Sequence, residues 1–334
     1  MTKRLALIAL VLLAACGSSQ SSSTNLKGFK LAVMLSGTPA DRGWNDSMYL
    51  AANQVAKDRS INVQFSQNTF DPTQSEPVLR QFLTGGFSVI VVDGFNFAPV
   101  VTQLAPQYPK QLFSLASFGH ANANVGIHTY SYLETGYSMC WLGARLSKSH
   151  IIGSVGASAV PFNTEENQGC ALGADAAVSG TKVINVFAND FFDQQKAREQ
   201  TQNVVDQGAD VIFVSGGVDS SLGAVAYCKD HSAIICLAVN TDQSDLAPNN
   251  MISSAVIDWK PFLNSVIDEV AAGKFTAHIY DATFENGGLV VPQFKAPGSD
   301  KVPAGVQQDF LKVIAQLKAG QITLPASGAH PGYR

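Results

Sequence analysis

The 334-residue chain lacks the features that define several functional classes. Asp, Glu, Lys and Arg make up only 14% of it, and no cluster of Lys and Arg offers a surface to nucleic acid. No apolar stretch reaches the roughly 20 residues that a helix needs to span a bilayer. We therefore expect no nucleic-acid partner and no membrane span in the body of the protein.

Catalytic and metal-binding signatures are also missing. The sequence contains no GxSxG, P-loop or HExxH motif, and no GxGxxG after its first apolar run. The six histidines are scattered without ligand spacing, so we expect no metal, no cofactor and no catalytic residue. An enzyme would need a titratable pair, for which Asp41, Asp193 and Asp242 are the candidates.

The five cysteines show no CxxC spacing, which argues against a zinc site. Apart from Cys16, they lie in apolar segments, at Cys140, Cys170, Cys228 and Cys236. We expect buried thiols, because cysteine packs as a small hydrophobe and a chain of this size needs no covalent staples. In an oxidising compartment, a Cys140–Cys170 or Cys228–Cys236 disulfide is the alternative.

The N-terminus carries a targeting signal. Residues 1–15 combine a basic start, a short apolar run and small residues directly before Cys16, which is typical of a bacterial lipoprotein signal peptide. An ordinary secretory signal is the alternative. Cleavage before Cys16 would leave a diacylated cysteine on a flexible tether, residues 16–28, and two acyl chains hold a protein on a membrane. We expect an extracytoplasmic, lipid-anchored protein.

The remaining 319 residues are long enough for two domains and carry a mild net charge of −6. Short apolar runs alternate with helical patterns throughout, which predicts parallel sheets covered on both faces. The predicted strands are 31–35, 61–65, 88–92, 111–115, 151–155, 182–187, 210–214 and 233–239. The predicted helices are 45–58, 74–84, 98–107, 133–147, 164–178, 193–207, 219–230 and 259–273. Eight such units favour two doubly wound α/β lobes over one sheet.

Aromatic and amide residues follow several predicted strands, where open α/β sheets bind ligands. Asp41, Trp44 and Asn45 follow the first strand, Phe95 follows the third, and Phe191 precedes a helix of the second half. We predict that Trp44 and Phe191, one from each lobe, stack on the two faces of a planar ligand. The alternative is that both rings pack in the core.

Several of these segments together resemble the basic membrane protein family of substrate-binding lipoproteins, which includes purine nucleoside receptors of bacterial ABC importers. The resemblance covers about residues 29–295. The segments that carry it are Asp41 to Asn45, Gly94-Phe95, Tyr108-Pro109 with Phe113, Glu134 to Gly143, Phe191 to Asp193, Gln207 to Phe213, Gly216-Gly217 and Asp242-Gln243.

The resemblance implies a type I periplasmic-binding-protein fold, in which the chain crosses a hinge three times. It implies an N-terminal lobe of residues 29–129 and 253–279, a C-terminal lobe of 130–252 and 280–325, and a tail of 326–334. It also implies that Trp44 and Phe191 sandwich a base, that Asp41 and Asn45 bind its polar edges, and that Gly216-Gly217 bring backbone close to the ligand.

The sequence departs from the family where relatives carry charged groups for the sugar. Ser117 and Asn240 stand in place of two aspartates, Asp242 is retained, and the family's lysine falls near Ile257, close to Lys260. Losing these charges together avoids an unpaired charge in a desolvated cleft. We therefore expect a planar, purine-like ligand whose ribose is recognised differently or not at all.

These observations predict a monomeric substrate-binding lipoprotein that captures a small molecule and delivers it to an ABC permease. A lipid-anchored ligand sensor that docks on a signalling receptor is the main alternative, and an enzyme on the same scaffold is a third.

Overall fold

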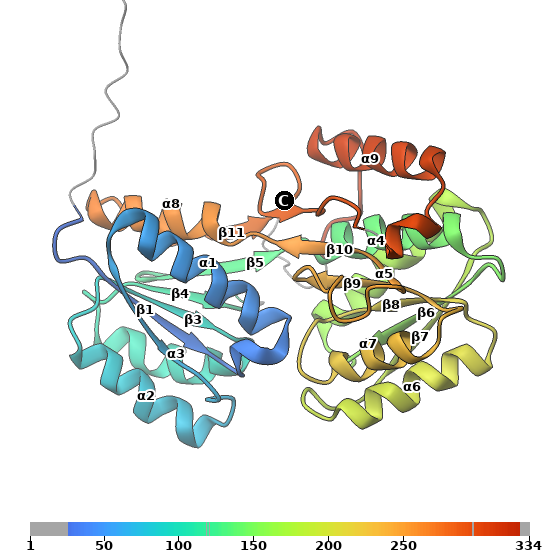
Figure 1. Ribbon diagram of the computed structural model, residues 1–334. Helices are drawn as coiled ribbons and strands as arrows, with labels where there is room; N and C mark the ends of the chain where they lie inside the picture. Colours follow the sequence, from blue (N-terminus) through green and yellow to red (C-terminus); the bar gives the residue numbers. More distant parts are fainter. Residues whose placement is uncertain (1–25, 118, 120, 296, 328–334) are drawn as a thin grey trace, which may run out of the picture.

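The computed structural model describes residues 26–327 except 118, 120 and 296. Within these residues the chain forms two α/β lobes side by side, each built on a six-stranded sheet (Figure 1). The expected signal peptide, Cys16 and most of the tether lie outside the described residues, as does most of the tail. No helix in the described part is long and apolar enough to cross a membrane.

The N-terminal lobe has the strand order β11-β5-β4-β3-β1-β2, with all neighbours parallel. Its strands are β1 (Lys30–Leu35), β2 (Asn62–Ser66), β3 (Val89–Asp93), β4 (Phe113–Ala116), β5 (Val125–Tyr130) and β11 (Ile279–Ala282). Its helices are α1 (Trp44–Arg59), α2 (Pro72–Thr84), α3 (Ala98–Leu104) and α8 (Lys260–Ala271), with short 3-10 turns that include η1 (Pro39–Asp41).

The C-terminal lobe has the order β12-β10-β9-β8-β6-β7, parallel except for the edge strand β12. Its strands are β6 (Ile151–Gly156), β7 (Lys182–Phe187), β8 (Val211–Val214), β9 (Ile235–Asn240), β10 (Met251–Ile257) and β12 (Leu289–Val290). Its helices are α4 (Tyr132–Leu146), α5 (Pro161–Ala177), α6 (Gln194–Asp206), α7 (Ser221–Asp230) and α9 (Ala304–Lys318).

Helices cover both faces of each sheet, which explains why the central strands are apolar throughout. In the view of Figure 1, α1 and α8 lie above the first sheet and α2 and α3 below it, while α4, α5 and α9 lie above the second sheet and α6 and α7 below it. One cluster of buried apolar side chains continues from the α1 side of the first sheet to the α4 side of the second. The two lobes therefore share part of their core.

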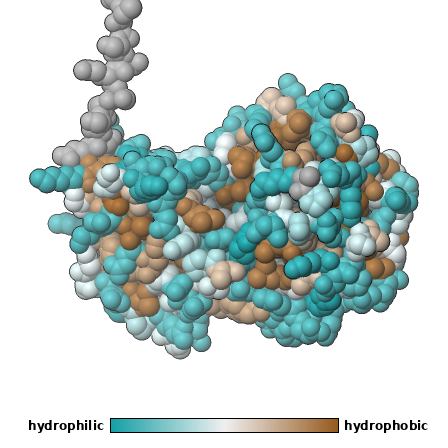
Figure 2. Space-filling view, viewed as in Figure 1, coloured by the Kyte–Doolittle hydropathy of each residue, from teal (hydrophilic) through white to brown (hydrophobic). Residues whose placement is uncertain are grey.

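The face seen in Figure 2 mixes hydrophilic and hydrophobic residues over both lobes.

The chain crosses between the lobes three times, as the resemblance implied. The crossings lie between β5 and α4, between β10 and α8, and between β11 and β12. They hydrogen-bond to one another: Ser131 N donates to Ala282 O at 2.9 Å and Asp258 N to Gly288 O at 2.8 Å. The lobe boundaries expected at residues 253 and 280 are wrong, because they cut through β10 and β11. Each of these strands pairs along its length with one sheet only.

The expectation of four free thiols is wrong. Cys140 and Cys170 form a disulfide between α4 and α5, with Cα atoms 4.9 Å apart, and Cys228 and Cys236 form one between α7 and β9, with Cα atoms 6.4 Å apart. All four cysteines are fully buried, so burial was predicted correctly, but facing elements bring the sulfur atoms together in pairs.

Candidate ligand-binding site

A cavity lies between the lobes, at the carboxyl ends of the strands of both sheets. Segments that follow β1, β2, β3 and β4 line it from the N-terminal lobe, and segments around α5, β7 and β8 line it from the C-terminal lobe. Its lining residues are Ser36, Gly37, Trp44, Asn45, Phe70, Gly94, Phe95, Ala116, Ser117, His128, Tyr130, Tyr132, Phe162, Phe191, Phe192, Gly216, Val218 and Asp219. Eight of these are Phe, Tyr or Trp, so the walls are mostly aromatic.

Trp44, the first residue of α1, lines the cavity and is partly exposed. Its indole N–H donates to Asp93 O at 3.3 Å, and its ring lies 5.9 Å from Tyr130 and 5.6 Å from Trp259, edge-on to the latter. These contacts fix the indole plane while leaving the side chain on the cavity wall. The sequence-based prediction placed Trp44 beside the ligand, and its position is compatible with that role.

Phe191 reaches the cavity from the loop between β7 and α6. Asp190 Oδ1 accepts from the backbone N–H groups of Phe192 and Asp193 at 2.9 and 3.1 Å, a local turn that presents the two phenylalanines. The Phe191 ring lies 5.7 Å from Phe70 and 5.8 Å from Phe95, both in the other lobe. The rings thus meet across the gap between the lobes.

Asp41 does not line the cavity, contrary to the role expected for it. Its carboxylate is buried at the start of α1 and accepts from the backbone N–H groups of Gly43, Asn45 and Asp46 at 2.9–3.1 Å. It therefore caps the helix, satisfying donors that have no partner inside it. Burial raises the pKa of Asp41, against the hydrogen bonds that favour its charged form.

Asn45 lines the cavity with its amide held on both sides. Nδ2 donates to Asp41 Oδ2 at 2.7 Å, and Oδ1 accepts from Gly37 N at 2.8 Å and from Ser36 Oγ at 3.2 Å. These partners fix which end of the amide is the donor. One N–H of Asn45 remains for a ligand.

The two glycines differ in position: Gly216 lines the cavity, whereas Gly217 does not, contrary to the role expected for it, and contacts the other lobe instead. Gly217 O accepts from Trp44 N at 2.7 Å. Both glycines have positive φ, 82° and 46°. A β-carbon on Gly43 would lie only 1.9 Å from Gly217 O, so the two lobes touch here backbone to backbone.

Buried Glu166 of α5 supports this corner of the site. Its Oε2 accepts from Gly216 N at 2.8 Å, and its Oε1 accepts from the Tyr130 and Thr135 hydroxyls at 3.2 and 3.1 Å. Burial raises the pKa of Glu166 to about 7. The sequence-based prediction did not identify this residue, because nothing in its helical segment marks it as different from a surface glutamate.

Asn240 and Asp242 lie away from the aromatic cavity, bordering a second hollow beside Arg42. The Asn240 amide donates to the carbonyls of Gly216 and Gly217 at 3.3 and 3.1 Å, so it supports the loop. Burial acts to raise the pKa of Asp242, but its bonds to Lys295, at 2.5 Å, and to Ser244 outweigh burial and lower the pKa. Neither residue lines the aromatic cavity, contrary to the ligand-binding role expected for both.

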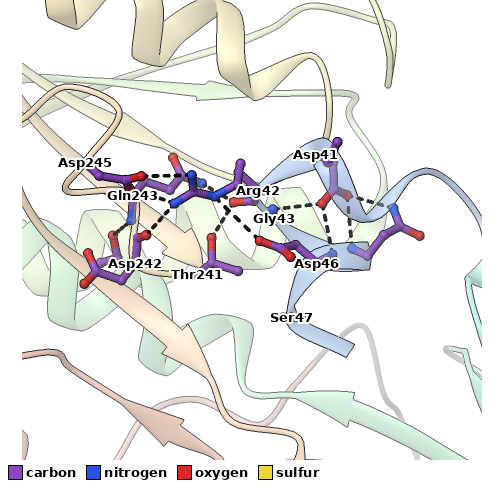
Figure 3. A network of polar contacts seen from close by, with 12 residues as sticks. Asp41, Arg42, Gly43, Asp46, Ser47, Thr241, Asp242, Gln243 and Asp245 are labelled. Atoms are coloured by element: carbon purple, nitrogen blue, oxygen red, sulfur yellow. Dashed lines mark hydrogen bonds and ion pairs between the residues drawn. The ribbon is translucent and has the colours of Figure 1, made fainter. Parts of the chain in front are cut away.

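Arg42 joins the two lobes through the network in Figure 3. Its guanidinium forks onto Asp245 at 2.7 and 3.0 Å and donates to Asp242 O at 3.3 Å. Its own carbonyl accepts from the side chains of Gln243, at 2.9 Å, and Thr241. The lobes are thus held in a closed arrangement on the side of α1.

Ser117 and Phe95, two of the expected ligand-binding residues, line the cavity, and so does His128, which was not among them. Both ring nitrogens of His128 are used, Nδ1 by Ser114 at 2.9 Å and Nε2 by Asp93 at 3.2 Å. Burial lowers the pKa of His128 to about 3 and keeps the ring neutral. Ser114 is buried and does not line the cavity, so this serine–histidine–aspartate chain presents no nucleophile to a ligand.

The carboxylates considered for an enzyme have structural partners. Asp193 caps α6 through Lys196 N at 3.1 Å, and Asp41 and Asp242 are engaged as described. Among the described lining residues the one carboxylate is that of Asp219, and none is Lys or Arg. Burial, with the nearby Asp41 carboxylate, raises the pKa of Asp219 to about 6.

A two-lobed α/β protein whose lobes jointly enclose an aromatic cavity belongs to the class that closes over a small ligand. The profile of the Bmp family, described as "ABC transporter substrate-binding protein PnrA-like", matches residues 29–316. The chain belongs to this family, and its fold is the type I periplasmic-binding fold.

Individual relatives agree with this assignment. The chain is 23% identical over 299 residues to a purine-binding protein of Brucella abortus, covering 88% of this chain and 82% of the relative. It is 22% identical over 346 residues to the ABC transporter nucleoside-binding protein BmpA of Lactococcus lactis, covering 96% and 97%. An ABC transporter solute-binding protein of Conexibacter woesei superposes with a TM-score of 0.74 at 26% identity, covering 89% and 98%.

Proposed function

We propose that the protein is the substrate-binding lipoprotein of an ABC importer and captures a purine base, a purine nucleoside or a related planar heterocycle. The observation that carries this proposal is the cavity walled by aromatic rings from both lobes, with Trp44 and Phe191 among them. Flat rings favour flat ligands, and each stacked base contributes about 1–3 kcal/mol. The names of two relatives, purine-binding and nucleoside-binding, support the same ligand class.

In this proposal the ligand contacts both lobes and stabilises their closed arrangement, after which a permease accepts it. No bond is made or broken. Trp44 and Phe191 supply stacking faces, Asn45 supplies a fixed N–H donor, Phe95 and Ser117 complete the wall, and Gly216 lets the loop approach. Cys16 carries the lipid that holds the protein on the outer face of a bacterial membrane.

The proposal also holds that the ribose is recognised differently from relatives or not at all. Support comes from Asn240, whose amide nitrogen donates to the Gly216 and Gly217 carbonyls, and from the neutral Ser117 on the cavity wall. Guanosine or inosine that binds at least as tightly as the free base would contradict this part.

The first experiment is native mass spectrometry of the purified protein, followed by calorimetry with purine bases and nucleosides. Trp44→Ala should weaken binding by about 10- to 100-fold, because it removes one stacking face. Trp44→Phe keeps a flat ring and should retain most of the affinity, and Leu50→Ala, at an exposed position of the same helix, serves as the control. An unchanged dissociation constant for Trp44→Ala would refute the stacking model.

A further inference from the structure

The polar groups of the cavity are unequal in what they leave for a ligand. The carbonyl oxygen of the Asn45 amide already accepts two hydrogen bonds, and both nitrogens of His128 are occupied. Gly216 N is taken by Glu166. The carboxylate of Asp219 is different, because within the described part of the chain it makes no hydrogen bond or ion pair of its own.

Asp219 also has no local structural task that would explain it. It precedes α7, where an aspartate often caps the helix through its side chain. Here the N–H groups of Ser220, Ser221 and Leu222 donate instead to the backbone carbonyls of Phe191, Val218 and Asp219. The carboxylate therefore stays available, half-buried on the cavity wall.

The carboxylate faces the polar corner of the opposite lobe. A β-carbon on Gly37 would lie 3.7 Å from Asp219 Oδ2 and 2.8 Å from Asn45 Nδ2, so both side chains border the space beside this glycine. A ligand held among the rings would therefore have one edge near both groups. With no Lys or Arg among the described lining residues, a ligand that carries a negative charge would meet Asp219 uncompensated.

We infer that Asp219 determines specificity by accepting a pair of adjacent N–H groups from one edge of the planar ligand. This inference rests on the proposed function and narrows it to neutral or cationic heterocycles with a ring N–H beside an exocyclic amine, the edge found in guanine. A carboxylate has two oxygens that match such a pair, as it does for the forked donors of arginine. Purines without that pair, and anionic ligands, are bound weakly.

The test compares ligands that differ by one donor. Guanine offers the N1–H and the 2-amino group, and hypoxanthine offers the N1–H alone. Asp219→Asn keeps one acceptor but turns an N–H donor toward the second ligand donor. We expect affinity for guanine to fall by about 30-fold, because guanine loses a hydrogen bond to a charged group and its second donor faces another donor. Affinity for hypoxanthine should fall less than about fivefold, because its single N–H keeps the remaining acceptor.

Asp230→Asn is the matched control, since it makes the same change on α7 at an exposed residue that pairs with Arg198. A thermal unfolding midpoint for each variant verifies that it is folded. Equal losses for the two purines in Asp219→Asn, or no loss for either, would overturn the inference.

A second ligand pair separates this inference from the proposed function. Benzimidazole is planar with one N–H, and 2-aminobenzimidazole adds the adjacent amine without being a purine. If the wild-type protein binds no purine but binds 2-aminobenzimidazole in an Asp219-dependent way, the purine assignment fails and the role of Asp219 stands. If neither ligand family binds, both are refuted.

Discussion

At the scale of single residues, the cavity depends on buried carboxylates that bind backbone groups and do not themselves line it. Asp41 orders the first turn of α1 and orients Asn45, and Glu166 holds Gly216 beside Tyr130. Each of these acids lies in low-dielectric surroundings, which disfavours its charged form unless hydrogen bonds compensate. The hydrogen bonds that compensate for burying these carboxylates also hold Asn45 and Gly216 in place on the cavity wall.

Glu166 should make stability depend on pH in a defined window. Its pKa is about 7 in the folded protein, above the value of about 4.3 in an unfolded chain, so the folded state holds the proton more tightly. The stabilisation of the folded state by this proton is complete below about pH 4.3. It is lost as pH rises through 7, at up to about 1.4 kcal/mol per pH unit.

Glu166→Gln keeps an acceptor for Gly216 N and turns an amide toward the Tyr130 and Thr135 hydroxyls, which can accept. Urea denaturation at pH 5, 6 and 7 should show the free energy of unfolding falling with pH in wild type and falling less in the variant. Parallel curves for the two proteins would mean that Glu166 does not titrate in this range.

The residues of the site were predicted unevenly from sequence, for a physical reason. Trp44, Asn45, Phe95, Ser117, Phe191 and Gly216 line the cavity, since side chains that directly follow parallel strands gather at one edge. Asp41 and Asn240 lie one layer away and hold backbone. Phe70 and Asp219, in loops, and Phe162, in the first turn of α5, were missed, because residue type does not encode which way these segments direct their side chains.

At the scale of elements, long amphipathic and apolar segments were predicted well, and strands that are short or mix polar with apolar residues were not. All eight predicted helices and all eight predicted strands have counterparts within a few residues. The strands β5, β10, β11 and β12 were missed, because they mix serine, histidine or tyrosine with apolar residues or are very short. Helix α9 was also missed, although Phe310, Val313, Ile314 and Leu317 are buried at helical spacing.

The disulfides join elements that also pack together, α4 with α5 and α7 with β9. Cys140 and Cys170 are 30 residues apart and Cys228 and Cys236 are 8 apart, so the first bridge restricts the unfolded chain more. In the chain-entropy model the bridges contribute about 3–4 and about 2–3 kcal/mol.

Replacing Cys140 and Cys170 by alanine should therefore lower the free energy of unfolding more than replacing Cys228 and Cys236 does. Urea denaturation of the two double variants measures the difference. Alkylation of the denatured, unreduced protein followed by mass spectrometry should leave these four cysteines unlabelled. Labelled cysteines at these positions would show that the thiols are free, as expected from sequence alone.

At the scale of the whole molecule, two contacts define how the lobes meet on the α1 side. The Arg42 network binds the start of α1 to the segment after β9 (Figure 3). The Gly43 backbone abuts Gly217. The exposed pairing of Arg42 with Asp245 adds little energy by itself. The contact between Gly43 and Gly217 constrains the spacing of the lobes more strongly, because neither glycine has a side chain that could move aside.

Gly43→Ala tests whether ligand binding requires this closed arrangement. The new β-carbon would lie 1.9 Å from Gly217 O and 2.5 Å from Gly217 C, so the lobes must separate to relieve the clash. We expect a larger radius of gyration in small-angle scattering and a ligand affinity lowered by at least about tenfold, because the closed form becomes a minor state.

Gly305→Ala, where a β-carbon meets nothing within 4 Å, is the control. Far-UV circular dichroism must remain unchanged, since loss of α1 would also weaken binding. A variant that keeps both its wild-type affinity and its wild-type radius would show that the lobes need not meet at this point, and that the ligand is held from one side.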